Sequence, residues 1–174
     1  MLGLNKGEVK LVPHNPEWTE LFQQEKQLLN SLIGDVAVAI EHIGSTAIKG
    51  IKAKPIIDMM VGLKQLDNAR DLDMRRMSEG AYYRLQRQTV EGKVIFAKFP
   101  ELDSGRSTKS HYLHVVEYEG YWWKAHLKFR DRLNDNPNLA KEYEALKIKN
   151  AEKYKDDAFT YIEAKEWFVN MVIQ

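Results

Sequence analysis

The stretch that decides the fold spans residues 41–63 and reads EHIGSTAIKGIKAKPIIDMMVGL. Residues 36–43 contain many β-branched side chains and predict a strand that ends at Gly44–Ser45. Residues 54–61 form a second apolar run, which is typical of a central strand of a sheet, and Asp58 lies within it. We therefore expect two strands joined by a glycine-containing turn and a short helical segment, with one carboxylate on the second strand.

The Gly44–Ser45 turn combines residue types that bind phosphate. Glycine lets a backbone approach a ligand closely. The hydroxyl groups of Ser45 and Thr46, together with free N–H groups at a helix N-terminus, can hold phosphate oxygens. The alternative is an ordinary strand-to-helix turn in which Ser45 is the N-cap. His42 lies just before the turn and is a further candidate, as a hydrogen-bonded acid or base.

Basic residues follow this turn, and no acid lies between residues 42 and 57: Lys49, Lys52 and Lys54. They predict contacts to an anionic ligand, whereas the alternative is a solvated surface cluster, which is the usual place for lysine. Lys128 and Arg130 extend this basic patch if the strand predicted around them lies beside it.

Asp58 is the candidate metal-binding and catalytic carboxylate. An aspartate in a buried strand is costly unless it is paired or binds a metal. Beside a phosphate-binding turn, its simplest use is to bind Mg²⁺, a hard cation that prefers oxygen ligands and substrate phosphates. The alternative is a structural carboxylate that is satisfied by Lys54 or by backbone N–H groups.

The remaining pattern predicts an α+β fold organised as a single domain, residues 1–174. A helix begins at Pro16 and ends at Gly34, and Glu119–Gly120 is a hairpin signal between the last two strands. The C-terminal part is predicted to be helical from its apolar stripes. Further strands are predicted at residues 8–12, 82–88, 94–99, 112–118 and 121–129, a helix at residues 67–78 and a loop at residues 100–109.

Histidines on the predicted strands are candidates for proton transfer. His111 and His114 are three positions apart, so they point to opposite faces of a strand. We expect His114 and His126 to meet across the predicted hairpin. Zinc usually needs three or four protein ligands, so a hydrogen-bonded, catalytic His114 is favoured over a histidine metal site.

The composition excludes several classes of function. The 26 Lys and Arg residues balance 25 Asp and Glu residues, and this formal charge of +1 argues against nucleic acid as a partner. The absence of cysteine excludes a disulfide scaffold, an iron–sulfur cluster and thiol catalysis. No apolar run approaches the roughly 20 residues of a membrane span, and no signal peptide is evident. We therefore expect a cytoplasmic protein that does not enter a membrane.

Several blocks of the chain resemble the GrpB family, also named UPF0157, of the nucleotidyltransferase superfamily. These blocks are residues 9–18 (VKLVPHNPEW), 42–63 (HIGSTAIKGIKAKPIIDMMVGL), 111–116 (HYLHVV), 129–133 (FRDRL) and 143–147 (YEALK). They occur in the order of the family and extend over most of the chain. Their joint occurrence is far more specific than a lone Gly-Ser pair.

The resemblance implies a nucleotidyltransferase-like mixed sheet flanked by helices. It also implies that Gly44 and Ser45 contact nucleotide phosphates and that Asp58 is the first carboxylate of a metal site. The superfamily pattern places a second carboxylate two residues later, where this chain has Met60. Methionine is no ligand for Mg²⁺, and two-metal phosphoryl transfer needs several carboxylates. Glu117 and Glu119 are alternative sources of a second one.

Two functions follow from the resemblance. In the first, the protein binds a nucleotide or another phosphorylated small molecule and uses Mg²⁺ to transfer a nucleotidyl group. In the second, it is a non-catalytic nucleotide- or coenzyme A-related binding or regulatory module that has lost the second metal carboxylate. The coenzyme A context comes from family members that are fused to dephospho-CoA kinase.

Overall fold

The computed structural model of this chain describes residues 2–70, 72–86, 90–102 and 107–174. Within this part of the chain, five strands form one sheet in the order β1-β2-β5-β4-β3. β2 and β5 are parallel and the other neighbouring pairs are antiparallel, so the sheet is mixed, as predicted. The strands are β1 (Ala37–Ile43), β2 (Ile57–Leu63), β3 (Tyr82–Arg84), β4 (Val94–Lys98) and β5 (His111–Glu117).

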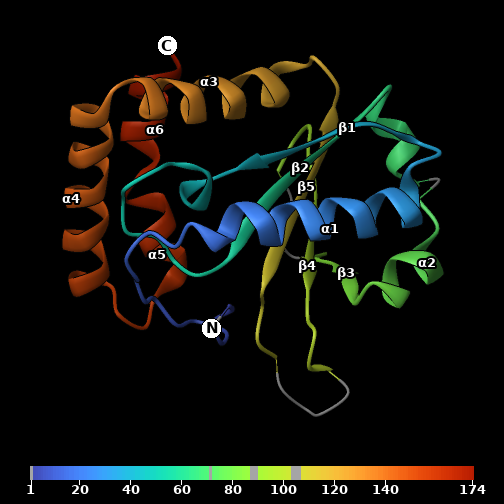
Figure 1. The fold of residues 1–174 in the computed structure, drawn as a ribbon, viewed down its shortest axis with the longest axis horizontal. Coiled ribbons are helices and arrows are strands. Elements are labelled where there is room, and N and C mark those ends of the chain that lie inside the picture. Colours follow the sequence, from blue (N-terminus) through green and yellow to red (C-terminus); the bar gives the residue numbers. More distant parts are fainter. Residues whose placement is uncertain (1, 71, 87–89, 103–106) are drawn as a thin grey trace.

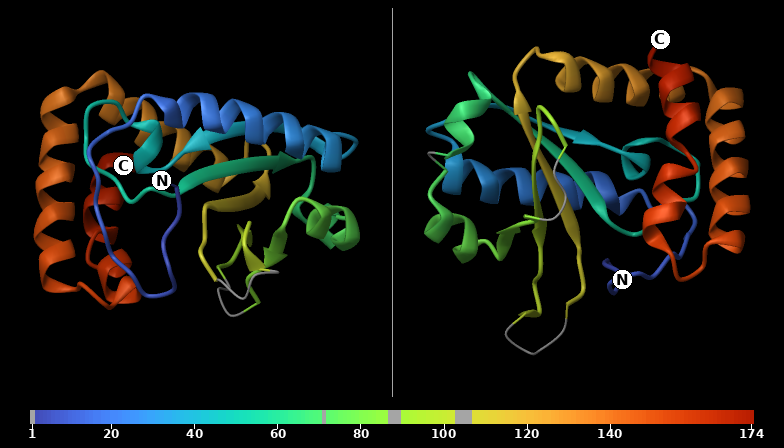
Figure 2. Two further views of the ribbon diagram at one scale, coloured as in Figure 1. Left: turned by 60° about the horizontal axis from the view of Figure 1, so that its bottom comes forward. Right: turned by 180° about the vertical axis from the view of Figure 1, so that it is seen from behind.

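Helices cover both faces of the sheet and form a further layer beside it (Figures 1 and 2). α1 lies along one face, α3 lies on the other, and α4, α5 and α6 stand together at one end (Figure 1). None of the described helices is long and apolar enough to cross a membrane. The helices are α1 (Glu17–Ile33), α2 (Met74–Glu79), α3 (Tyr121–Asp135), α4 (Pro137–Lys153), α5 (Ala158–Glu163) and α6 (Glu166–Ile173).

The alternation of side chains along β2 decides which of them reach each helix layer. Met59 belongs to the buried cluster that contains Phe22 of α1, whereas Met60 packs with Trp123 of α3. Alternate residues of a strand share a face, so Asp58 lies with Met60 on the α3 face. β2 therefore presents its carboxylate to the side of the sheet that carries α3.

Residues 121–129 are helical, so the predicted strand and its hairpin are wrong. Gly120, in an extended conformation, caps the N-terminus of α3, and Glu119 turns the chain with a φ of 58°. The buried side chains of α3 recur at helical spacing rather than at every second residue: Trp123, Phe129 and Leu133. Lys128 and Arg130 consequently lie on a helix and not on the edge of a strand.

The predicted strand at residues 8–12 is also wrong. Val12 makes a single antiparallel bridge to Ala53, and the backbone N–H of Val9 bonds instead to the carbonyl of Lys155. A ladder needs successive residues to pair with one partner strand. This segment divides its hydrogen bonds between distant parts of the chain, so it stays irregular.

The predicted helix at residues 67–78 divides into a 3-10 helix, η2 (Leu66–Arg70), and α2. Asp73 starts α2 anew, because its side chain accepts hydrogen bonds from two backbone N–H groups of the first turn. β3 ends at Arg84, earlier than predicted. The end of that predicted strand and residues 103–106 of the predicted loop lie outside the described residues.

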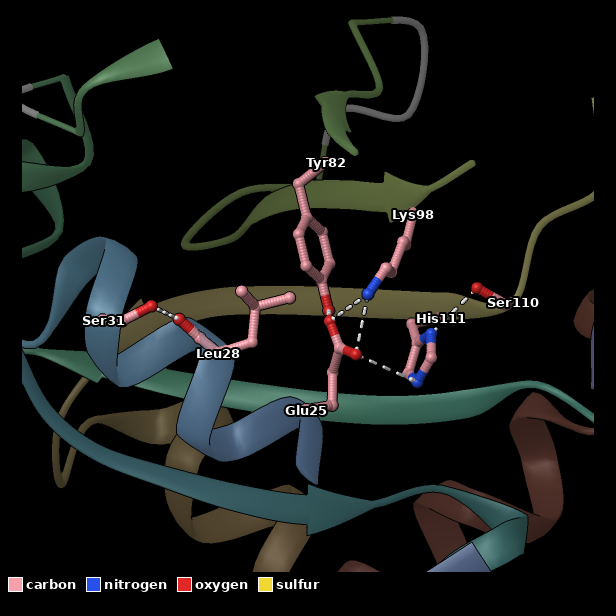
Figure 3. A network of polar contacts seen from close by, with 7 residues as sticks. All are labelled: Glu25, Leu28, Ser31, Tyr82, Lys98, Ser110 and His111. Atoms are coloured by element: carbon pink, nitrogen blue, oxygen red, sulfur yellow. Dashed lines mark hydrogen bonds and ion pairs between the residues drawn. The ribbon is translucent and has the colours of Figure 1, made fainter. Parts of the chain in front are cut away.

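A buried polar network joins α1 to the sheet (Figure 3). It lies on the face opposite Asp58, because His111 is next to Tyr112, the register partner of Asp58. The Glu25 carboxylate accepts hydrogen bonds from the Tyr82 hydroxyl at 2.8 Å and from the Lys98 Nζ at 2.7 and 2.8 Å. His111 Nε2 lies 3.9 Å from the same carboxylate. Burial and the Glu25 charge raise the pKa of Tyr82 well above its usual value. Glu25 therefore ties α1 to β3, β4 and β5.

Replacing this carboxylate tests how much it stabilises the fold. We expect Glu25→Gln to lower the free energy of unfolding by about 3 kcal/mol, because it leaves the partly buried Lys98 ammonium without its counter-charge. Glu20→Gln, at an exposed position of the same helix, is the matched control and should change little. Urea denaturation measures both, and equal stabilities of the two variants would contradict this role.

Buried histidines make the fold sensitive to acid. Burial lowers the pKa of His42 and of His111 from 6.5 to about 4, so the unfolded chain binds protons there at a higher pH than the folded chain. Stability is then fully present above pH 6.5 and falls as the pH drops toward 4. At pH 5 each histidine costs roughly 2 kcal/mol, at about 1.4 kcal/mol per pH unit. The free energy of unfolding, measured by denaturation at several pH values, should fall less steeply between pH 6.5 and 4 for His111→Gln than for the wild type. An unchanged pH dependence would contradict the role of His111.

Candidate functional site

The Gly44–Ser45 turn packs directly on Asp58. Gly44 has a φ of 70° and a ψ of −170°, a region that is essentially restricted to glycine. A Cβ atom at this position would lie 2.4 Å from Asp58 Oδ2 and 2.8 Å from Asp58 Cβ. The 3-10 helix η1 (Ser45–Ala47) follows at once, as the predicted short helical segment. The absence of a side chain at residue 44 therefore brings the turn against the carboxylate.

His42 and Thr46 hold this turn from the opposite face of the sheet. His42 Nε2 lies 2.9 Å from Thr46 Oγ1, and its ring stacks on Phe22 with centroids 4.9 Å apart. Both residues are buried. Because their polar groups pair with each other, they hold the two ends of the Gly44–Ser45 turn together. Direct contact of His42 and Thr46 with a ligand stays a prediction.

Two tyrosines connect Asp58 and the turn to the neighbouring elements. Burial raises the pKa of Tyr143 of α4 to about 12, an effect that a hydrogen bond with Ser45 partly offsets. Tyr112 of β5 is the register partner of Asp58, and burial and the Asp58 charge raise its pKa to about 12 as well. Both phenols stay protonated near neutral pH and can donate hydrogen bonds.

His114 is brought close to Asp58 by the parallel pairing of β2 and β5. Its Nε2 lies 3.6 Å from Asp58 Oδ1, and the two side chains are 18% and 31% exposed. His114 also meets His126 with ring centroids 5.4 Å apart, as predicted, although His126 comes from a helix. His111 lies on the other face, beside Glu25, which confirms that the two histidines of β5 point apart. The carboxylate and His114 form a pair that can hold or move a proton.

Three lysines from separate segments between the helices and strands feel the charge of Asp58. Burial lowers the pKa of Lys54, Lys93 and Lys165 to about 8 each, and the Asp58 charge raises all three. Among the described residues, none of these lysines forms an ion pair with an acid; their ammonium groups contact aromatic rings instead. The site thus holds more positive than negative charge, which suits an anionic ligand.

The other predicted basic residues are exposed or make contacts with groups other than Asp58. The Lys128 ammonium donates to the carbonyl of Gln174, and the Lys52 side chain is exposed. Arg130 pairs with Glu41 at 2.7 Å and with Asp131, and it donates to the carbonyl of His42. Lys54 is the predicted basic residue on which the Asp58 charge acts, and ligand binding by Lys52, Lys128 and Arg130 stays a prediction.

The position of the second carboxylate is closed by packing. Met60 is fully buried against Val116 and Trp123. Glu117 pairs with Leu63 at the far end of β2, on the other face from Asp58, and Glu119 follows it in the turn before α3. Glu41 pairs in register with Met60 and is neutralised by Arg130. Glu117 and Glu119 are therefore not placed to share an ion with Asp58, whereas Glu41 is on the same face but is held by Arg130.

The donor set does not fit a pair of magnesium ions. Across residues 2–70, 72–86, 90–102 and 107–174, no group of three His, Cys, Asp or Glu side chains is placed to hold a metal ion. A single Mg²⁺ would rely on Asp58 alone, beside three ammonium groups, with water and ligand phosphates as its other ligands. Magnesium binding stays a prediction of the sequence.

A family profile accounts for nearly the whole chain: the GrpB protein family matches residues 8–174. The chain belongs to the GrpB family. It is 50% identical to the glutamate-rich protein GrpB of Alkalihalophilus pseudofirmus, over 99% of this chain and 98% of that protein. The crystal structure of conserved protein GrpB from Enterococcus faecalis superposes with a TM-score of 0.81 at 27% identity, over 94% of each chain.

More distant similarities extend beyond GrpB proteins. A structure of the Cid1 poly(U) polymerase with MgGTP bound gives a TM-score of 0.54 at 11% identity, over 82% of this chain and 44% of that one. At this identity the match shows a shared nucleotidyltransferase-like fold. The chain is also 29% identical to dephospho-CoA kinase of Mycolicibacterium paratuberculosis, but it spans only 45% of that kinase.

The structure adds three residues that the sequence did not single out. Lys93 directly precedes β4, and Lys165 lies between α5 and α6. Tyr143 of α4 reaches Ser45 in the Gly44–Ser45 turn. Their proximity to Asp58 depends on how distant segments of this GrpB chain pack together. Neither strand alternation nor motif spacing in the sequence predicts contacts between such distant segments.

Alanine at residue 44 tests the packing of the turn on Asp58. Gly44 and Gly50 both have a positive φ, but nothing lies within 4 Å of a Cβ built on Gly50. We expect Gly50→Ala to cost roughly 1 kcal/mol of stability through its backbone. Gly44→Ala should cost about 2 kcal/mol more through overpacking.

Chemical denaturation of both variants measures the difference. In an Asp58→Ala background, part of the extra cost of Gly44→Ala should disappear, because the Oδ2 and Cγ contacts are gone. Equal costs at Gly44 and Gly50 would contradict the close packing.

Proposed function

We propose that this GrpB protein binds a nucleotide or another phosphorylated small molecule at the Gly44–Ser45 turn. The observation that carries the proposal is the packing of this turn on Asp58 inside a group of lysines that lack acidic partners among the described residues. A glycine turn that leads into a helical segment exposes backbone N–H groups to phosphate oxygens. The lysines supply the opposite charge that a phosphate needs.

The comparisons support the same class of ligand. Cid1, which shares the fold, is described with MgGTP bound. The distantly related kinase acts, by its name, on dephospho-coenzyme A, which is a nucleotide derivative. Nucleoside phosphates and coenzyme A precursors are therefore the first candidates.

A binding or regulatory role fits the side chains better than nucleotidyl transfer. Transfer through two metal ions needs several carboxylates, and Met60 fills the place of the second one. Asp58 and His114 remain as a carboxylate–imidazole pair, with Nε2 3.6 Å from Oδ1. Rapid Mg²⁺-dependent turnover of a nucleotide by the unmodified protein would contradict a purely binding role.

A charge introduced at the turn tests where the ligand binds. Calorimetric titration with nucleotides, coenzyme A and its precursors should find at least one ligand. Ser45→Glu should then weaken its binding roughly tenfold or more, because like charges in contact cost several kcal/mol. Ser31→Glu, at an exposed position of α1, is the control and should bind like the wild type. The proposal fails if no compound binds, or if Ser45→Glu binds as tightly as the wild type.

A further inference from the structure

Two lysines share one buried aromatic ring near Asp58. The Nζ atoms of Lys54 and Lys165 lie 5.2 and 4.5 Å from the ring centre of Tyr161, which is almost fully buried. An aromatic face attracts a cation but does not cancel its charge. Each ammonium group therefore keeps its positive charge beside the other, and their repulsion adds to the effect of burial in lowering the pKa of Lys54.

A third lysine reaches the same face of the sheet from another direction. Lys93 alternates with Ile95, which pairs in register with His114, so it points to the face that carries Asp58. Its Nζ lies 3.6 Å from the ring centre of Trp122 and 2.7 Å from His126 Nε2. Burial lowers the pKa of His126 to about 2. The histidine is therefore neutral, accepts the hydrogen bond and leaves the charge of Lys93 uncompensated.

The arrangement places positive charge on both sides of the carboxylate. Lys54 precedes the start of β2, whereas Lys93 lies next to the end of β4 that pairs with Val115. The charges of three ammonium groups thus act on one carboxylate, and a partly buried charge is costly unless it is paired. An anion would relieve this excess, whereas a divalent cation would add to it.

We propose that Lys54, Lys93 and Lys165 neutralise the phosphates of the ligand themselves, so that this site binds a polyphosphate-bearing small molecule without a divalent metal ion. This inference rests on the proposed function and specifies how the charge of the ligand is balanced. Asp58 then serves as the internal counter-charge of the lysines. The same inference explains why Met60 occupies the position of the second carboxylate, because a site without metal ions needs only Asp58.

Calorimetric titration with ATP and with inorganic tripolyphosphate tests the inference, once with excess Mg²⁺ and once with EDTA. We expect binding in EDTA to be as tight as in Mg²⁺ or tighter. Lys54→Gln, Lys93→Gln and Lys165→Gln should each weaken binding roughly tenfold, which corresponds to the loss of one charge-assisted hydrogen bond. Lys124→Gln, at an exposed position of α3, is the matched control and should not change the affinity.

Thermal unfolding of the same variants separates lost binding from lost structure. A partly buried ammonium group without an acidic partner destabilises a fold, so the three site variants should be at least as stable as the wild type. Residues that serve binding or catalysis commonly lower the stability of a fold in this way.

The outcomes distinguish this inference from the proposed function. Binding that disappears in EDTA, or site variants that bind like the wild type, would overturn the inference and leave the proposed function standing. If neither ATP nor tripolyphosphate binds in Mg²⁺ or in EDTA, the inference is overturned; if the nucleotides and coenzyme A precursors also fail to bind, the proposed function is overturned with it.

Discussion

The contact between the Gly44 backbone and the Asp58 side chain is the constraint on which the site depends. A side chain at residue 44 would overlap the carboxylate, and the backbone conformation there suits glycine. The contact places the turn beside Asp58, which also lies near His114 and pairs in register with Tyr112. The charge of Asp58 also acts on Tyr143 and on three lysines. Without it, the turn and the carboxylate would not lie side by side.

The two faces of the sheet differ in how their charges are balanced. On the α1 face, the charges are matched: Glu25 satisfies Lys98 and Tyr82, and the surrounding cluster is apolar. On the α3 face, Arg130 and Glu41 cancel, but the lysines around Asp58 outnumber it. A fold can keep such an unbalanced group only if the rest of the structure stabilises it. The buried network on the opposite face contributes to that stability.

Local patterns in the sequence predicted much of this fold. The Gly44–Ser45 turn and the helix after Pro16 are governed by neighbouring residues, and the structure has them where the sequence predicts. The strand around Asp58 is also present, but it spans Ile57–Leu63 rather than residues 54–61. The strand predicted at residues 121–129 is wrong because polar and aromatic residues recur there at every second position, as in a strand: Trp122, Lys124, His126 and Lys128. The buried residues of this segment follow helical spacing instead. An amphipathic helix and a strand compete in such a stretch, and tertiary packing decides between them.

The site was only partly predictable, since its members come from distant segments. Gly44, Ser45 and Asp58 lie within one motif, and His114 follows from strand alternation. Lys93 and Lys165 are brought in by β4 and by the C-terminal helices, and no spacing rule links them to Asp58. The Glu25 network is unpredictable from the sequence for the same reason, because Tyr82 and Lys98 are 57 and 73 positions away from Glu25 along the chain.

A crystal structure of the protein grown with ATP and Mn²⁺ tests the central claim most directly, because manganese can be located by its anomalous scattering. We expect phosphate density between the Gly44–Ser45 turn and the ammonium groups of Lys54, Lys93 and Lys165, with no manganese bound to Asp58. Phosphates bound elsewhere, or a manganese ion joining them to Asp58, would contradict it.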